Sequence, residues 1–157
     1  MIVTRSPVAL DANLAVLFTV GLANIDYIEK HKRLRRYDVA AFRLLDELLG
    51  AADGVVWCPH VLTETSNLVL YLNDPIRPEA AAALALLVNR YQEKAIPSAE
   101  GCARPEYLRL GLTDAILLTL ASTGATLVTD DLDLHLAAAS ADLPSINFNE
   151  LRDEVVA

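Results

Sequence analysis

The sequence predicts an α/β fold in which helices surround a central parallel sheet. Short apolar segments alternate with longer segments of helical periodicity, and this alternation is typical of βαβ units. The 157 residues fit one globular domain. A content of 54% hydrophobic and 22% charged residues excludes a disordered chain and a coiled coil. Because no repeat, linker or low-complexity segment divides the chain, we expect a single domain over residues 1–157.

The first half of the chain is expected to contain two strands and four helices. Gly50 is a residue type that ends helices, and Pro75, which follows Asn and Asp, closes another helix. Pro78 suits the first turn of an Ala-rich helix. In chain order, the expected elements are a strand at 7–10, helices at 14–22 and 36–49, a strand at 55–58, and helices at 61–72 and 78–91.

The second half is expected to contain three strands and three helices. Residues 125–129 form the clearest strand of the chain, and Gly124 before them ends a helix. Residues 98–111 show no periodicity, so we expect an irregular segment there. In chain order, the expected elements are a short strand at 95–97, a helix at 113–122, a strand at 125–129, a helix at 132–139, an edge strand at 143–147 and a helix at 149–155.

Charge and cysteine content narrow the functional classes. The net charge of −8 argues against charge-driven binding of nucleic acid over the whole surface, but it leaves room for a local basic site. Cys58 and Cys102 are far apart and predict neither a disulfide scaffold nor a thiolate zinc site. No apolar run approaches the roughly 20 residues of a membrane span. Residues 1–5 lack the features of a secretory leader, so we expect a cytoplasmic protein.

Four acidic residues stand at positions where a parallel sheet brings ligands together. Asp11 and Asp131 follow predicted strands, Glu64 lies one turn into the helix after another strand, and Asp114 opens a helix. The carboxyl ends of parallel strands form the ligand crevice of open α/β sheets. We therefore expect these four carboxylates to converge.

Each acid also has a purely structural interpretation. The three Asp residues lie at predicted helix starts, where Asp is a favoured N-cap. Glu64 shares a helical face with Val61, Leu68 and Tyr71, so its side chain is expected to turn toward the interior. No Lys or Arg lies one turn away, so a buried Glu64 would need a cation or another polar partner, and a hydrogen bond to Thr or Asn is the structural alternative.

Four converging carboxylates require a counter-charge. Oxygen ligands are the ones that hard divalent cations prefer, so the sequence favours Mg²⁺ or Mn²⁺. Zinc is disfavoured because His31, His60 and His135 are scattered and none has the spacing of a helical ligand pair.

Four sequence segments that carry these acids resemble the PIN-domain nuclease family, including VapC-type toxins. The matching segments are Leu10-Asp11-Ala12-Asn13, Val61-Leu62-Thr63-Glu64, Thr113-Asp114-Ala115 and the run from Leu127 to Leu134. The resemblance spans nearly the whole chain and implies a three-layer α/β/α fold with a Mg²⁺- or Mn²⁺-dependent endoribonuclease site. The implied catalytic and metal-binding residues are Asp11, Glu64, Asp114 and Asp131, supported by Asn13, Thr129, Asp130 and Asp133, with Asp130 as the alternative fourth acid.

One region departs from the small toxins, because a basic and helical insertion occupies residues 30–50. Five of the chain's 13 Lys and Arg residues fall within seven positions of it: Lys30, Lys32, Arg33, Arg35 and Arg36. Such a cluster can contact RNA phosphates and guide the strand to an acidic crevice. The alternative is a solvated surface segment.

The resemblance leads to a functional expectation with two alternatives. We expect a metal-dependent endoribonuclease that acts on RNA, with membership of a toxin–antitoxin pair, an antitoxin protein as inhibitor and a homodimeric state as further implications. The first alternative is a catalytically silent PIN-like scaffold that binds RNA or protein. The second is a different Mg²⁺ enzyme of phosphoryl chemistry. A haloacid-dehalogenase-type phosphatase is disfavoured because its Asp-x-Asp motif would need Asp where Asn13 stands.

Overall fold

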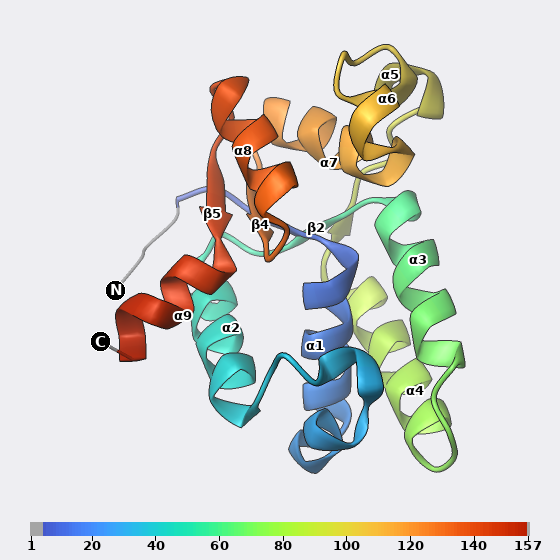
Figure 1. The fold of residues 1–157 in the computed structure, drawn as a ribbon. Coiled ribbons are helices and arrows are strands. Elements are labelled where there is room, and N and C mark those ends of the chain that lie inside the picture. Colours follow the sequence, from blue (N-terminus) through green and yellow to red (C-terminus); the bar gives the residue numbers. More distant parts are fainter. Residues whose placement is uncertain (1–4, 157) are drawn as a thin grey trace.

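Short parallel strands form the centre of a mixed α/β structure (Figure 1). This computed structural model describes residues 5–156, and of Arg33 it describes only the backbone. Most of the segment in which we looked for a leader, Met1–Thr4, lies outside the described residues. The strands are β1 (Val8–Leu10), β2 (Val56–Trp57), β3 (Gln92–Glu93), β4 (Thr126–Thr129) and β5 (Ser145–Asn147).

The strand pairing places the ends of β1 and β4 side by side. β4 pairs in parallel with β1 on one side and β5 on the other, and β2 pairs in parallel with β3. A parallel bridge between Val8 and Val55 joins the two sets, which gives the order β3-β2-β1-β4-β5. In this register Leu10 lies opposite Val128. The residues that follow β1 and β4 therefore emerge at the same edge of the sheet.

Helices lie in two groups with the strands between them (Figure 1). One group contains α1 to α4, and the other contains α5 to α8. α9 lies beside α2 in the view and contacts β5. The α-helices are α1 (Ala12–Ala23), α2 (Val39–Ala51), α3 (Pro59–Leu70), α4 (Ile76–Arg90), α5 (Ser98–Cys102), α6 (Tyr107–Leu110), α7 (Leu112–Ser122), α8 (Leu132–Ser140) and α9 (Phe148–Val156), with 3₁₀ helices at Ile25–Lys30 and Lys32–Leu34.

Helix α1 is the centre of its group because nearly its whole surface is apolar and buried. It packs against α2, α3 and α4. Gly21 permits the close approach of α2, since a Cβ at this position would lie 2.2 Å from the ring of Phe42. The rings of Phe18 and Phe42 stack at 6.2 Å between centroids. This packing fixes α1 among α2, α3 and α4.

Three local expectations are wrong. The third strand is Gln92–Glu93 rather than 95–97, because α4 ends at Arg90 and the backbone N–H of Lys94 already donates to the Trp57 carbonyl at 2.8 Å. Residues 98–111 contain α5 and α6, short helices that are stabilised by packing on α7 and lack a periodic pattern of their own. The helix expected from residue 36 begins at Val39, because Asp38 caps it by accepting from the Ala41 N–H at 2.8 Å.

Within residues 5–156, no helix combines the length and the apolar character that a bilayer span requires.

Candidate active site

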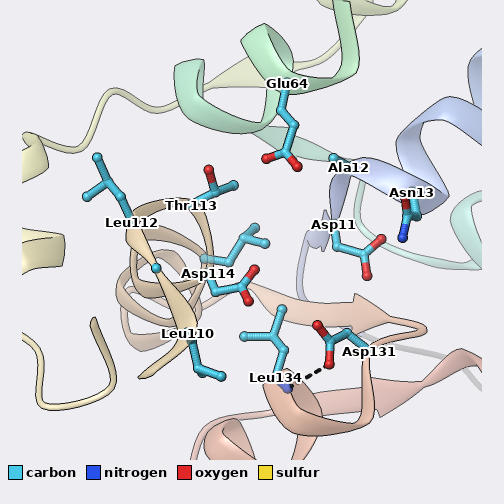
Figure 2. A pocket seen from close by; sticks show the side chains of 12 residues that line it. Asp11, Ala12, Asn13, Glu64, Leu110, Leu112, Thr113, Asp114, Asp131 and Leu134 are labelled. Atoms are coloured by element: carbon cyan, nitrogen blue, oxygen red, sulfur yellow. Dashed lines mark hydrogen bonds between the residues drawn. The ribbon is translucent and has the colours of Figure 1, made fainter. Parts of the chain in front are cut away.

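All four predicted acids line one pocket at the carboxyl ends of β1 and β4. The pocket has a volume of about 340 Å³, and the side chains of Asp11, Glu64, Asp114 and Asp131 surround a common space in it (Figure 2). They come from the start of α1, from α3, from α7 and from the start of α8. The expected convergence is therefore found. Asn13, a predicted supporting residue, lines the same pocket.

Asp11 is both a helix cap and a pocket residue. Its Oδ1 atom accepts from the backbone N–H of Leu14 at 2.9 Å, which caps α1. Its Oδ2 atom accepts from the hydroxyl of Thr129 and from the backbone N–H of Asp130 at 3.2 Å. The side chain is fixed on both oxygens, so Asp11 presents a defined carboxylate to the pocket.

Thr129 connects two of the acids. Its hydroxyl donates to Asp11 and accepts from the backbone N–H of Asp131 at 3.0 Å. The residue is fully buried at the end of β4. These two hydrogen bonds are of the kind expected for the supporting role that the sequence predicts for Thr129.

Asp131 also caps a helix while it lines the pocket. Its Oδ1 atom accepts from the N–H groups of Asp133 at 2.9 Å and Leu134 at 3.3 Å, at the start of α8. Among the described residues, none donates to its Oδ2 atom. Capping thus uses one oxygen and leaves the other for a ligand.

Asp114 does not cap its helix. Gly111, with φ of +91°, occupies the N-cap of α7, and Asp114 lies in the first turn without a side-chain capping bond. Burial raises the pKa of Asp114 to about 6, and the nearby carboxylates of Asp131 and Glu64 contribute to the rise. The capping interpretation is therefore wrong for this residue.

The expectation that Glu64 turns toward the interior is wrong, because its side chain is exposed. The buried stripe of α3 runs through Val61, Thr65, Leu68 and Val69, and position 64 lies at the flank of this stripe. Tyr71, which was expected on the same buried face, follows the last residue of α3 and is 82% exposed. Glu64 nevertheless lines the pocket, at its solvent side.

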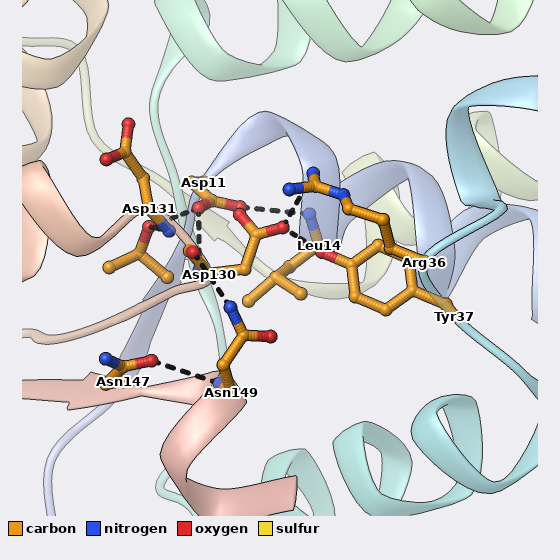
Figure 3. Close-up of polar contacts among 9 residues, drawn as sticks. Asp11, Leu14, Arg36, Tyr37, Asp130, Asp131, Asn147 and Asn149 are labelled. Carbon is orange, nitrogen blue, oxygen red and sulfur yellow. Dashed lines mark hydrogen bonds and ion pairs between the residues drawn. The ribbon is translucent and has the colours of Figure 1, made fainter.

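The three acids after β4 have different environments. Asp131 faces the pocket, whereas the buried Asp130 turns to Arg36 and Tyr37 (Figure 3). Asp133 is exposed in the first turn of α8 and does not line the pocket. Consequently Asp131, and not its alternative Asp130, is the fourth acid of the pocket.

The pocket lacks a positive partner for its carboxylates. Burial and the neighbouring Asp130 raise the pKa of Asp11 to about 8, although the hydrogen bonds from Thr129 and Leu14 oppose this rise. No Lys, Arg or His belongs to the described residues that line the pocket. His60 contacts Ser98 and His135 contacts Ser145, and neither lines the acidic pocket. The donor set is therefore made of oxygen atoms and carries uncompensated negative charge.

The oxygen atoms of this donor set suit a hard divalent cation, but the acidic side chains lie too far apart to bind one as they stand. Carboxylate oxygens are the ligands that Mg²⁺ and Mn²⁺ prefer. In the described part of the chain, however, no three Asp, Glu, His or Cys side chains are grouped closely enough to hold a metal ion. Asp11 and Asp131 are held in place by hydrogen bonds from backbone N–H groups.

Comparisons with protein-family models, with curated proteins and with solved structures found no match.

One ion pair connects the basic segment to Asp130, the residue before the pocket acid Asp131. Lys30, Lys32, Arg35 and Arg36 are exposed, and a guanidinium nitrogen of Arg36 lies 2.9 Å from Asp130 Oδ2. The side chain of Arg33, also predicted to bind RNA, lies outside the described part of the structure.

Sequence reasoning missed Tyr37 and Asn149. The hydroxyl of Tyr37 donates to Asp130 Oδ2, and the side-chain amide of Asn149 donates to the Asp130 carbonyl at 3.2 Å. A lone Tyr after a basic run and a lone Asn in the last helix have no motif around them. Only the fold brings them to the turn beside the pocket.

Proposed function

We propose that this protein is a Mg²⁺- or Mn²⁺-dependent endoribonuclease of the PIN type. The observation that carries the proposal is the convergence of four carboxylates from four separate elements on one pocket whose described lining includes no basic residue. These four acids are the residues to which the PIN resemblance assigns the metal site. The parallel strands between two helix groups support the proposal of a three-layer α/β/α PIN fold.

The protein's own residues have distinct roles in the proposed reaction. Asp11, Glu64, Asp114 and Asp131 would hold the cation, which supplies Lewis-acid stabilisation of the negative charge on the reacting phosphodiester. Thr129 and the N–H of Leu14 orient Asp11, and the α8 N-terminus orients Asp131. The exposed Lys32 and Arg35 lie on the basic segment, where they can contact phosphates on the approaching strand.

A silent PIN-like scaffold is the second candidate. What favours it is the spacing of the acids, which are not grouped for metal binding in the described structure. In that case the pocket would bind RNA or protein without hydrolysis.

The test is incubation of purified protein with total RNA in the presence of Mn²⁺ or Mg²⁺, with EDTA in a parallel sample. We expect cleavage that EDTA abolishes, because the acids cannot act without their cation. Binding of RNA without metal-dependent cleavage would favour the scaffold.

Neutralising the basic segment should weaken RNA binding and its salt dependence. In the double variant Lys32→Gln/Arg35→Gln, two exposed cations are lost. For a single strand, the slope of log K against log salt should fall by about 1.4 if both contact phosphates. Arg36 is left unchanged because it pairs with the buried Asp130. The matched control is Arg77→Gln/Arg90→Gln on exposed positions of α4, which should leave the slope unchanged.

We also expect the protein to form a homodimer, as the PIN resemblance implies. Helix α4 buries Ala80, Leu84 and Leu87 in this chain, whereas Leu86 is 73% exposed. A single exposed Leu is common on monomeric proteins, so the expectation of a dimer rests on the resemblance. Light scattering at micromolar concentration should give twice the 17.0 kDa mass of one chain, and a monomer mass would contradict the expectation. An antitoxin partner is proposed from the resemblance alone.

A further inference from the structure

The turn between β4 and α8 is held by side chains from two distant segments (Figure 3). The Tyr37 hydroxyl and the Arg36 guanidinium both bind Asp130 Oδ2, and the Asn149 amide donates to the Asp130 carbonyl. We name Arg36, Tyr37 and Asn149 the turn clamp. Its members belong to the segment before α2 and to α9, and none of them lines the acidic pocket.

The clamp residues are themselves fixed. Tyr37 is 5% exposed, and its ring meets Phe148 of α9 edge to face at 6.4 Å. The backbone N–H of Asn149 donates to Asn147 Oδ1 at 3.0 Å, which anchors the start of α9 to β5. Burial and the nearby Asp130 carboxylate raise the pKa of Tyr37, so its phenol remains a hydrogen-bond donor. The clamp can therefore define the position of Asp130.

Asp130 transmits this position to two of the pocket acids. Its backbone N–H donates to Asp11 Oδ2 at 3.2 Å, and it is joined by a peptide bond to Asp131. Its carboxylate, held by Tyr37 and Arg36, does not line the pocket but lies close enough to the Asp11 carboxyl group to raise its pKa. A shift of Asp130 would thus disturb both Asp11 and Asp131, while Glu64 and Asp114 would keep their positions.

We propose that the turn clamp positions the acidic pocket for a divalent cation, by holding the Asp130 turn and through it Asp11 and Asp131. This inference rests on the proposed function, since it concerns the cation of the same site. Arg36, Tyr37 and Asn149 are positioning residues because they act through Asp130 and touch neither substrate nor cation. Residues that orient metal ligands in this way typically change metal affinity about 10- to 100-fold when they are removed.

The experiment is calorimetric titration of the purified protein with Mn²⁺, without RNA. Tyr37→Phe removes one hydroxyl and keeps the ring that packs on Phe148, so we expect the Kd for Mn²⁺ to rise about 10-fold. The matched control is Tyr27→Phe. Its hydroxyl also donates to a carboxylate, Glu79 Oε2 at 2.6 Å, but outside the acidic pocket. This control should keep the parent Kd.

A second pair of variants keeps the test decisive if Tyr37→Phe folds poorly. Asn149 is exposed, and Asn149→Ala removes its amide bond to the Asp130 carbonyl. Asn89→Ala removes the same type of bond, from an exposed Asn to the Ala85 carbonyl at 2.8 Å, on α4. We expect weaker Mn²⁺ binding only in Asn149→Ala. Unfolding midpoints measured in EDTA separate this effect from a general loss of stability.

The outcomes distinguish the clamp from the proposed function. Parent affinity in both Tyr37→Phe and Asn149→Ala overturns the clamp and leaves the metal site intact. Loss of affinity equal to that of the Tyr27→Phe and Asn89→Ala controls also overturns it. Mn²⁺ binding that depends on the clamp, in a protein that does not cleave RNA, supports the clamp and contradicts the nuclease. Absence of Mn²⁺ binding by the parent overturns both.

Discussion

Asp114→Asn is expected to reduce Mn²⁺-dependent RNA cleavage at least about 100-fold, since loss of a direct ligand should exceed the effect of losing an outer partner. The substitution removes a charge with little change in volume. Asp114 makes no side-chain capping bond, so the fold loses no hydrogen bond there. Asp11→Asn should abolish cleavage too, but it also disturbs the contacts with Thr129 and Asp130. Asp114 is therefore the cleaner position for the test.

The control is Asp46→Asn, an exposed acid on α2 that should retain full activity. Because every variant is purified in the same way, this pair also detects contaminating nuclease. Full activity of both Asp11→Asn and Asp114→Asn would refute the assignment of the pocket.

If the protein is a toxin, induced expression of the parent should arrest bacterial growth, and Asp114→Asn should relieve the arrest. Normal growth with soluble parent protein would remove the support for a toxin.

The metal-free protein is expected to lose stability as the pH rises from 5 to 8. Both Asp114 and Asp11 have a raised pKa in the folded state, about 6 and about 8 against 3.8 for the ordinary group. The folded state therefore binds protons more tightly than the unfolded state. This contribution to stability is complete below pH about 4 and is lost as the pH passes through 6 and then 8. Burial of the two carboxylates is the larger cause of the raised pKa values, and repulsion from neighbouring acids adds to it.

The size of this effect can be stated for Asp114. Its pKa rise from 3.8 to about 6 corresponds to about 3 kcal/mol before screening, and partial exposure reduces this to about 1 to 2 kcal/mol. Denaturant unfolding in EDTA at pH 4 and pH 8 measures it, because the loss begins at the unfolded-state pKa of 3.8. Asp114→Asn should be more stable than the parent at pH 8 and should show a smaller loss between the two pH values. Equal pH dependence in parent and variant would contradict a raised pKa of Asp114 in the folded state.

The pocket could be predicted from the sequence because its position follows from the parallel direction of the strands. Parallel strands end at one edge, so acids placed just after strands or in the following helix turns meet there even when Asp11 and Asp131 are far apart in sequence. The choice between Asp130 and Asp131 could not be predicted. It depends on the turn after β4, where Thr129 accepts from the Asp131 N–H and Tyr37 binds the Asp130 side chain.

Other errors have equally local causes. The exposure of Glu64 was missed because periodicity places it near the buried stripe of α3 but does not locate the edge of that stripe. The position of β3 depends on where α4 ends and on the hydrogen bond from the Lys94 N–H to the Trp57 carbonyl. A strand of two residues is too short for its sequence pattern to predict either feature. Short helices such as α5 form by packing on α7, so their own sequence contains little signal.

The pairing of β1 with β4 also determines when the pocket is completed in a newly synthesised chain. Asp11 is made early, but its partners Thr129 and Asp130 belong to a strand and turn that the ribosome adds more than a hundred residues later. The Asn149 contact follows later still. A growing chain therefore carries an incomplete pocket until β4 and the turn after it have been synthesised. If the protein cleaves RNA, the messenger and ribosome that produce it are protected from it up to that point.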